Sequence, residues 1–252
     1  MLGSGSSGNC TFLATNQVKI LIDAGLSRRE TLRRLASIGE SADSIQAILV
    51  THEHWDHIAG LARIAAKNQI PVYISSLTRE SLPPQTQLPA VETIQAGSRF
   101  QIGDLTIEPF TIPHDAVDPV AFRLTCAGVQ VAVCTDLGYI PQNVKESLRG
   151  THCLILESNH DLEMLRNGPY PWAVKQRVMS RTGHLSNSAL SEFLTADFDR
   201  EARLLILAHL SEQNNHPEIA RLAAASALES KSASGVRLAV SSQREPTEVF
   251  EF

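Results

Sequence analysis

Residues 52–57, His-Glu-His-Trp-Asp-His, constrain what this chain can fold into more than any other stretch. They offer three imidazoles and two carboxylates, ligand types that suit zinc, manganese or iron. An apolar run at 45–50 precedes them, and apolar residues with helical spacing follow at 58–65. We therefore predict a strand, a ligand-bearing loop and a helix. In this loop His52 and His54 would converge on one ion, while Asp56 and His57 face a second.

The composition is that of a globular chain. Its 252 residues, 43% of them hydrophobic, suffice for one large domain or two similar halves, and we expect a single domain over 1–252. No apolar run reaches the roughly 18 residues of a membrane span, and no signal-peptide pattern opens the chain, so we expect a cytoplasmic protein without a membrane partner. The cysteines are irregularly spaced in apolar runs and are predicted to be reduced and buried: Cys10, Cys126, Cys134 and Cys153.

The net charge and the distribution of positive residues point in different directions on whether the chain binds nucleic acid. A net charge of −5 counts mildly against a nucleic-acid partner, because a strongly basic domain attracts phosphates and this one does not. Positive clusters lie on two predicted helices: Arg28, Arg29, Arg33 and Arg34 on one, and Lys175, Arg177 and Arg181 on the other. For each cluster we favour a solvated helix face over a phosphate-binding surface.

The N-terminal residues 3–8 spell G-x-G-x-x-G. No strand can precede them, and the runs at 10–14 and 18–22 predict a hairpin where a dinucleotide site would need a helix. We expect a loop whose amides and hydroxyls, those of Ser6 and Ser7 included, approach an anionic substrate. Asp23 ends the second run and would, at the least, form a turn hydrogen bond.

The remaining pattern predicts a mixed sheet. Ser27 and Glu30 form a capping box for a helix that ends at Gly39, and a helix from Pro217 runs to about Ser230. We predict a surface loop at 82–90 and strands at 72–76, 91–95, 99–102, 105–112, 120–126, 129–135 and 236–241. His114, Asp136 and His209 each follow an apolar run, where a polar residue can also be an ordinary strand end.

The 52–57 stretch resembles the signature of the metallo-β-lactamase fold superfamily, most of whose members are hydrolases. The resemblance implies an α/β (α+β) fold, a four-layer αββα sandwich of two mixed sheets with the metals along one edge. It also implies that Asp23 orients the metal loop from behind. The implied ligands are His52, His54 and His114 for one ion, Asp56, His57 and His209 for the other, and Asp136 between the two.

Such a site would hold two divalent ions, zinc or manganese, with iron possible. Two ions about 3.5 to 4 Å apart acidify a bridging water into a hydroxide nucleophile and polarise the oxygens of the reacting centre. That chemistry suits a phosphodiester, and it would also serve a thioester or a lactam. We expect Asp56 to be essential for catalysis.

Segments at 4–9, 113–116, 157–161, 183–187 and 209–215 look like the YycJ family, also called WalJ or VicX, and the similarity extends over nearly the whole chain. The resemblance implies a DNA exonuclease. By likeness to related phosphodiesterases such as RNase Z, His184 would donate to the scissile phosphate or leaving oxygen, and Glu157 would orient it. The alternative for His184 is a polar residue at a helix start. Residues expected to contact substrate are Ser6, Ser7, Asn9, His160, Ser186, Asn187 and Asn214.

The chain lacks the large cap of RNase J-type enzymes and the long arm of RNase Z, so we expect an open cleft that accepts a strand end. Two alternatives remain. One is a small-molecule hydrolase, a cyclic phosphodiesterase or glyoxalase II-like thioesterase, which the acidic net charge favours. The other is a non-catalytic regulatory scaffold, which would be expected to have lost ligands.

Overall fold

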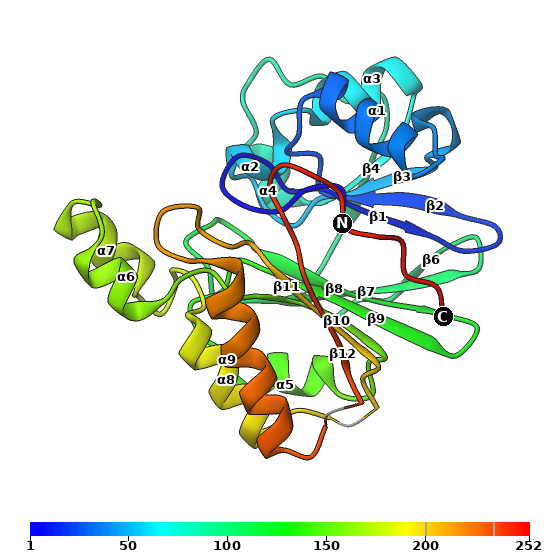
Figure 1. Ribbon diagram of the computed structural model, residues 1–252. Coiled ribbons are helices and arrows are strands. Elements are labelled where there is room, and N and C mark those ends of the chain that lie inside the picture. The colour runs from blue at the N-terminus through cyan, green and yellow to red at the C-terminus, as the bar shows by residue number, and fades with distance from the viewer. Residues whose placement is uncertain (200, 234) are drawn as a thin grey trace. The chain divides into compact units, whose positions relative to one another are not determined.

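A computed structural model describes residues 1–199, 201–233 and 235–252 (Figure 1). The chain forms two compact units. Unit 1 comprises Met1–Pro109, Ala116–Val120 and Ser242–Phe252, and unit 2 comprises Phe110–Asp115 and Ala121–Ser241. The single domain expected over 1–252 stays a prediction.

Unit 1 is built on a five-stranded mixed sheet in the order β1-β2-β3-β4-β5. Its strands are β1 (Thr11–Ala14), β2 (Lys19–Ile22), β3 (Ala47–Leu49), β4 (Val72–Ser75) and β5 (Val91–Ile94). The predicted hairpin β1–β2 is antiparallel, and the other neighbours pair in parallel. A second hairpin, β6 (Phe100–Ile102) with β7 (Leu105–Thr111), turns at Gly103, whose φ of 55° favours glycine. The last two residues of β7 fall in unit 2.

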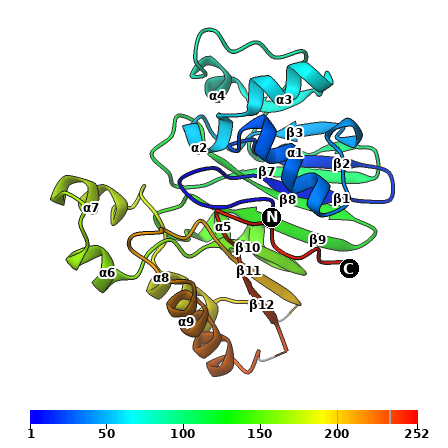
Figure 2. The same cartoon turned by 45° about the horizontal axis from the view of Figure 1, so that its top comes forward.

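Helices cover one face of this sheet, as α1 and α3 show in Figures 1 and 2. They are α1 (Arg28–Ser37), the 3-10 helix η1 (Ala42–Ser44), α2 (Trp55–Ile58), α3 (Leu61–Asn68) and α4 (Ser76–Glu80). Alternate strand side chains, such as Leu21, Ile48 and Val72, pack against Leu35 and Leu61 from the helices. The period of two along each strand thus places one apolar row in this core.

The start of α1 confirms one predicted cap and corrects one predicted surface. Ser27 Oγ accepts from Glu30 N at 3.3 Å, as a capping residue should. The Glu30 carboxylate binds Arg33 and Arg34 instead of returning to the cap, so the reciprocal half of the capping box is not formed. Arg34 is buried and donates to Leu2 O at 2.7 Å, so it does not belong to the solvated face predicted for this cluster.

Unit 2 contains five neighbouring strands of a second, mixed sheet, in the order β12-β11-β10-β9-β8. The strands are β8 (Val120–Cys126), β9 (Val129–Cys134), β10 (Cys153–Glu157), β11 (Leu204–Ala208) and β12 (Arg237–Val240). The hairpin β8–β9 turns at Ala127 and Gly128 as predicted, and β9 to β12 pair in parallel. Parallel strands end at one edge of a sheet, which is where the polar residues after β9, β10 and β11 lie.

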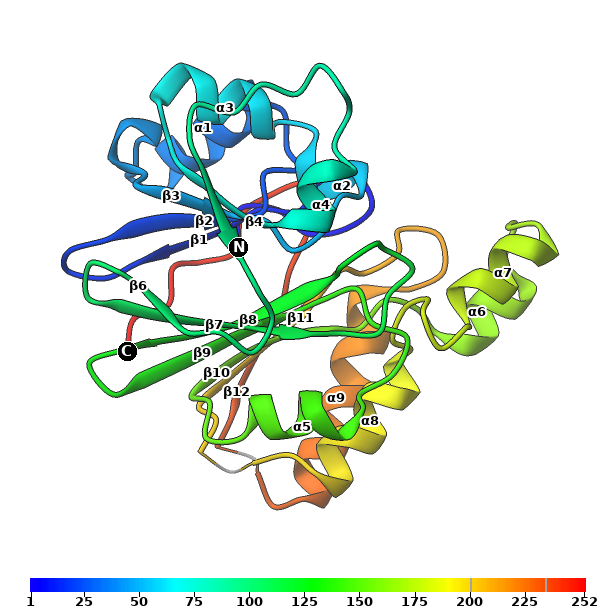
Figure 3. The same ribbon diagram turned by 180° about the vertical axis from the view of Figure 1, so that it is seen from behind.

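The helices of unit 2 are α5 (Gln142–Leu148), α6 (Leu162–Asn167), α7 (Trp172–Val178), α8 (Asn187–Ala196) and α9 (Pro217–Ser230). Helices α8 and α9 lie side by side on the sheet (Figures 1 and 3), where Leu190 and Ala224 pack on Leu156 and Leu207. His216 caps α9, whose predicted limits are confirmed. Helices α6 and α7 project from this core (Figure 3). Helix α7 ends at Val178, so Arg181 lies beyond the helix that was predicted to carry it together with Lys175 and Arg177.

All four cysteines are free thiols in the described part of the chain, and Cys10, Cys134 and Cys153 are buried as predicted; Cys126, at the end of β8 beside the turn, is only half-buried, which corrects the prediction for it. Burial raises the pKa of Cys10 and of Cys153 to about 12, which makes both thiols unreactive at neutral pH. Within the described residues, every helix is too short or too polar to cross a bilayer.

Candidate metal centre

The metal loop, residues 52–57, follows β3 in unit 1 and continues into α2, so that Asp56 and His57 lie in the first turn of this helix; the stretch brings three imidazoles together. The ring of His52 lies 4.7 Å from that of His54 and 4.1 Å from that of His57, measured between centroids. His52 and His57 are fully buried. Three rings at this spacing at the end of a buried strand are a donor set suited to a divalent ion.

A buried carboxylate, Asp23, holds this loop from behind. Its Oδ1 accepts from Thr51 N at 2.9 Å, and its Oδ2 lies 2.8 Å from His57 Nδ1. Metal-binding imidazoles characteristically use one ring nitrogen for such a carboxylate, so Nε2 is the ligand atom that His57 would offer. Asp23 thus has the geometry that its predicted role requires.

Gly25 and Asn9 fix the other side of the loop. A Cβ on Gly25 would lie 1.6 Å from Asp56 O, so only glycine lets these backbones approach. Asn9 N donates to Asp56 O at 2.7 Å, and Asn9 Nδ2 lies 3.1 Å from Asp56 Oδ2 and 3.0 Å from His57 Nε2. Asn9, predicted to touch substrate, therefore positions the loop. Ser6 and Ser7 are exposed.

In unit 2, four residues from four segments form one cluster: Asp136, Glu157, His184 and His209. Each offers one ligand atom, and these atoms all lie within 4.8 Å of one another. Both His184 Nδ1 and His209 Nδ1 lie 2.8 Å from Glu157 Oε1, and His209 Nδ1 lies 3.3 Å from Asp136 Oδ1. The structure thus brings two predicted ligands next to both members of the predicted proton-donating pair.

Glu157 organises this cluster. Its Oε2 accepts from the backbone N–H groups of Leu137 and Leu185, at 2.9 and 3.1 Å, while Oε1 faces the two imidazoles. Burial alone would raise the pKa of Glu157, but the charge of His184 and hydrogen bonds from His184 and His209 lower it to about 2. Burial likewise disfavours charge on His184, and the Glu157 carboxylate outweighs it and raises the pKa of that imidazole. The pair therefore favours the protonated form of His184.

His114, the remaining predicted ligand of unit 2, lies close to this cluster. Its Nδ1 lies 3.2 Å from Gly183 O, and its Nε2 lies 3.9 Å from Asp136 Oδ1. Burial lowers the pKa of His114, which favours the neutral ring that a metal needs. The carbonyl contact at Nδ1 again makes Nε2 the ligand atom on offer.

Three candidate residues at strand ends have left-handed backbones, which the sequence does not reveal. The φ angles are 61° at Asp23, 63° at Asp136 and 56° at His209. Such angles cost free energy in non-glycine residues and are characteristic of functional sites. Asp23 and His209 directly follow β2 and β11, and Asp136 comes two residues after the end of β9.

Two predicted substrate residues have structural contacts. Ser186 Oγ accepts from Ala189 N at 3.1 Å and caps α8. Asn187 Oδ1 accepts from Ser158 Oγ at 2.7 Å inside a buried amide network. These contacts hold the segment that carries His184, so both residues have a positioning role in the structure.

Two others, His160 and Asn214, keep buried polar atoms without a partner among the described residues. Both ring nitrogens of His160 and Oδ1 of Asn214 have none. Burial lowers the pKa of His160 to about 4, so the ring is neutral at physiological pH. Unsatisfied buried groups of this kind are costly and suggest a ligand or ion.

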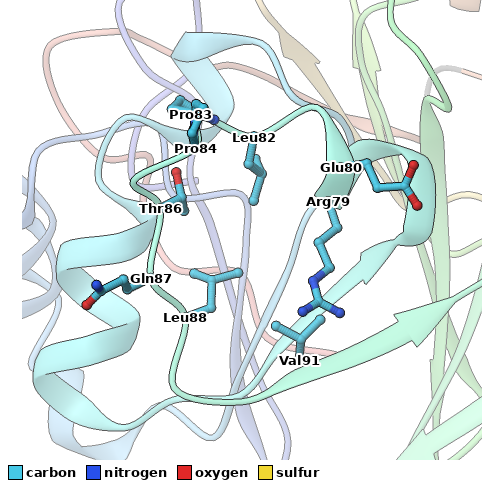
Figure 4. A pocket seen from close by; sticks show the side chains of 9 residues that line it. All are labelled: Arg79, Glu80, Leu82, Pro83, Pro84, Thr86, Gln87, Leu88 and Val91. Carbon is cyan, nitrogen blue, oxygen red and sulfur yellow. The ribbon is translucent and has the colours of Figure 1, made fainter.

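The donor set as a whole fits divalent metals, because it consists of imidazole nitrogens and carboxylate oxygens. Four of the seven predicted ligands lie in unit 1 and three in unit 2. A separate open pocket of about 610 Å³ in unit 1, between Arg79 and Val91, contains none of the predicted site residues (Figure 4).

Comparison with known proteins agrees with this geometry. The family described as beta-lactamase superfamily domain matches residues 18–210. Exodeoxyribonuclease YycJ of Bacillus anthracis is 36% identical over 236 residues, covering 92% of this chain and 89% of its own. Exodeoxyribonuclease WalJ of Streptococcus pneumoniae serotype 2 is 36% identical over 227 residues, covering 88% of this chain and 84% of its own.

The fold has solved counterparts as well. The metallo-β-lactamase fold protein YhfI of Bacillus subtilis superposes with a TM-score of 0.71 at 18% identity, covering 96% of this chain and 94% of its own. The predicted fold class, an α/β protein with two mixed sheets of the metallo-β-lactamase type, is confirmed. The chain belongs to the β-lactamase superfamily and, within it, is a metal-dependent hydrolase of the family that includes YycJ and WalJ.

Proposed function

We propose that this protein is a dinuclear-metal-dependent phosphodiester hydrolase that acts on DNA as an exonuclease. The observation that carries the proposal is the Glu157–His184 pair, in which Nδ1 and Oε1 lie 2.8 Å apart beside Asp136 and His209. A phosphodiester needs a proton for its leaving oxygen, and this pair supplies a held proton next to candidate metal ligands. Relatives at 36% identity are named exodeoxyribonucleases, which supports DNA as the substrate.

The residues that would hold the metals are those predicted from the sequence, His52, His54, Asp56, His57, His114, Asp136 and His209. Zinc and manganese both suit this mixture of nitrogen and oxygen donors. Two bound ions would activate a water and polarise the phosphate oxygens. The protein's own contribution is to fix its imidazoles, through Asp23 in unit 1 and Glu157 in unit 2.

His184 is proposed as the proton donor. Glu157 holds its Nδ1, so its Nε2 is the nitrogen that would face the leaving oxygen. Because the carboxylate raises the pKa of His184, the ring is protonated over a wider pH range than an exposed histidine. After the P–O bond breaks, the proton moves from Nε2 to the alkoxide, and solvent restores it.

The test is a substrate panel with the zinc- and the manganese-loaded protein. We expect progressive shortening of end-labelled single- or double-stranded DNA, together with hydrolysis of bis-(p-nitrophenyl) phosphate. RNA and a glutathione thioester are included for comparison. Rapid thioester turnover with intact DNA would overturn the proposal in favour of a small-molecule hydrolase. Metal content is measured on the same samples by elemental analysis.

A further inference from the structure

Helix α7 (Trp172–Val178) differs from the other helices in the described part of the chain, because it buries none of its residues. Its first residue, Trp172, is 64% exposed. The preceding helix α6 is anchored by Leu165, which is fully buried. An aromatic side chain on a helix without a buried face contributes little to the core. A large exposed apolar side chain of this kind is characteristic of a binding surface.

The segment around α7 is basic in an acidic chain. Residues 162–181, here called the α6–α7 arm, contain four cations and one carboxylate, a net +3, whereas the whole chain carries −5. Glu163 is paired with Arg166, and Arg177 binds Asp115 at 2.6 Å. Lys175 donates to a backbone carbonyl, that of Arg166.

The fourth cation of the arm is Arg181. The Arg181 guanidinium lies over the Tyr139 ring, 4.2 Å from its centroid, in a cation–π contact that leaves its charge in place. Among the described residues, no carboxylate lies within ion-pair distance of Lys175 or Arg181. The arm therefore combines an exposed indole with two cations not neutralised by an ion pair.

The end of α7 is attached to the segment that carries His184. His184 N donates to Val178 O at 2.9 Å, and Gly183 N donates to Ser180 O at 3.0 Å. A Cβ on Gly183 would lie 2.2 Å from Arg177 O, so the two backbones are in direct contact. A chain bound along α7 is thereby held at a fixed place relative to the His184 segment.

We propose that the α6–α7 arm binds the single-stranded stretch of DNA that adjoins the scissile end. Trp172 stacks on a base, and Lys175 and Arg181 neutralise phosphates. Aromatic stacking and cation contacts of this kind bind single strands without sequence preference. The inference rests on the proposed function, because it names how that same site holds its substrate.

The experiment measures affinity and turnover separately. Binding of the metal-loaded protein to a phosphorothioate oligothymidylate that resists hydrolysis is followed by fluorescence anisotropy. For Trp172→Ala we expect about tenfold weaker binding, the loss typical of one base-stacking ring. The double variant Lys175→Gln/Arg181→Gln should reduce the slope of log affinity against log salt by about 1.4, since each phosphate contact on a single strand contributes about 0.7.

Matched controls lie outside the arm. Phe252→Ala removes another exposed aromatic ring, and Lys67→Gln removes another exposed cation. Both are expected to bind as the wild type does. Trp172→Phe keeps a ring that can stack and should retain most of the affinity, so it distinguishes lost stacking from lost folding.

The outcomes separate the two proposals. In Trp172→Ala, the ratio of oligonucleotide turnover to bis-(p-nitrophenyl) phosphate turnover should fall about tenfold, as binding does. If wild-type protein shortens DNA while Trp172→Ala keeps wild-type affinity and ratio, the arm is not a DNA surface and the proposed function still holds. Failure of the wild type to cleave any phosphodiester would reject the proposed function itself. Wild-type binding to phosphatidylglycerol vesicles that Trp172→Ala loses, with DNA affinity unchanged, would assign the arm to lipid and overturn the inference.

Discussion

The two units present their candidate ligands in opposite ways. Unit 1 takes all of its four from the metal loop, 52–57, so that neighbours in sequence become neighbours in space. In unit 2 the predicted ligands Asp136 and His209 come from separate segments, and only tertiary folding brings them within 4.8 Å of each other and of the Glu157–His184 pair. Motif reading can therefore recognise the first set directly, whereas the second set depends on strand order.

Despite this difference, each set is fixed by one buried carboxylate. Asp23 accepts from a backbone N–H of unit 1 and contacts His57, and Glu157 accepts from two backbone N–H groups of unit 2 and contacts His184 and His209. Backbone donors fix the orientation of a carboxylate, so the imidazoles that contact it are held in place as well. The comparison predicts that both carboxylates act by positioning rings.

The largest effect is expected from the metal loop itself. Asp56→Asn keeps the size of the side chain and its contact with Asn9 but removes a negative charge from the donor set. We expect kcat on DNA to fall by about a thousandfold or more, since metal-assisted charge stabilisation contributes several kcal/mol. Activity and bound metal are measured together. An unchanged rate would implicate a contaminant or another site.

His184→Ala tests the unit 2 cluster at its proton donor. We expect a loss of about a hundredfold to ten-thousandfold on DNA, the contribution typical of general acid catalysis. Bound metal should stay at the wild-type level. Because p-nitrophenolate leaves without a proton, the rate of bis-(p-nitrophenyl) phosphate hydrolysis should fall much less. Equal losses on both substrates would show that His184 holds the metal or the fold and does not donate a proton.

Most of the fold could be predicted from the sequence, because the spacing of apolar residues and the presence of turn residues are local signals. Strands β3 and β4, the β8–β9 turn, the cap of α1 and the limits of α9 all follow from neighbouring residues. The metal loop could be predicted for the same reason. The residues His114, Asp136 and His209 were found through a family resemblance, since strand-end polar residues alone are common.

What the sequence could not predict depends on close packing and backbone angle. The amino-acid sequence does not show that Asp56 O approaches Gly25 so closely that only glycine fits there. It also does not show that Arg34 is buried. The sequence indicated a solvated helix at α7, but the exposure of Trp172 was not predicted, since a tryptophan is ordinarily placed in a core. These features arise from contacts between segments that are distant in the sequence. Such contacts leave no periodic pattern of apolar residues from which they could be predicted.

A smaller effect is expected from the carboxylate behind the metal loop. Asp23→Asn tolerates the φ of 61° and can still accept from Thr51 N, but it loses the charge that faces His57. Metal affinity should fall about ten- to a hundredfold, as measured by competition with a chelator. Thermal unfolding of the metal-free variant serves as the control for folding. Wild-type affinity would mean that Asp23 only closes a turn.

The smallest effects compare two helix caps, Ser27 on α1 and Ser186 on α8. Replacing either serine by alanine should lower the free energy of unfolding by about 1 kcal/mol, because one N–H of the first helical turn loses its acceptor. Denaturant titration measures this. Ser186 is also expected to touch substrate, so Ser186→Ala should raise KM for DNA, whereas Ser27→Ala should leave it unchanged. If both variants lose only stability, capping of α8 is the whole role of Ser186. Substrate contact in unit 2 must then come from other residues, such as His160 and Asn214, which have unsatisfied buried atoms.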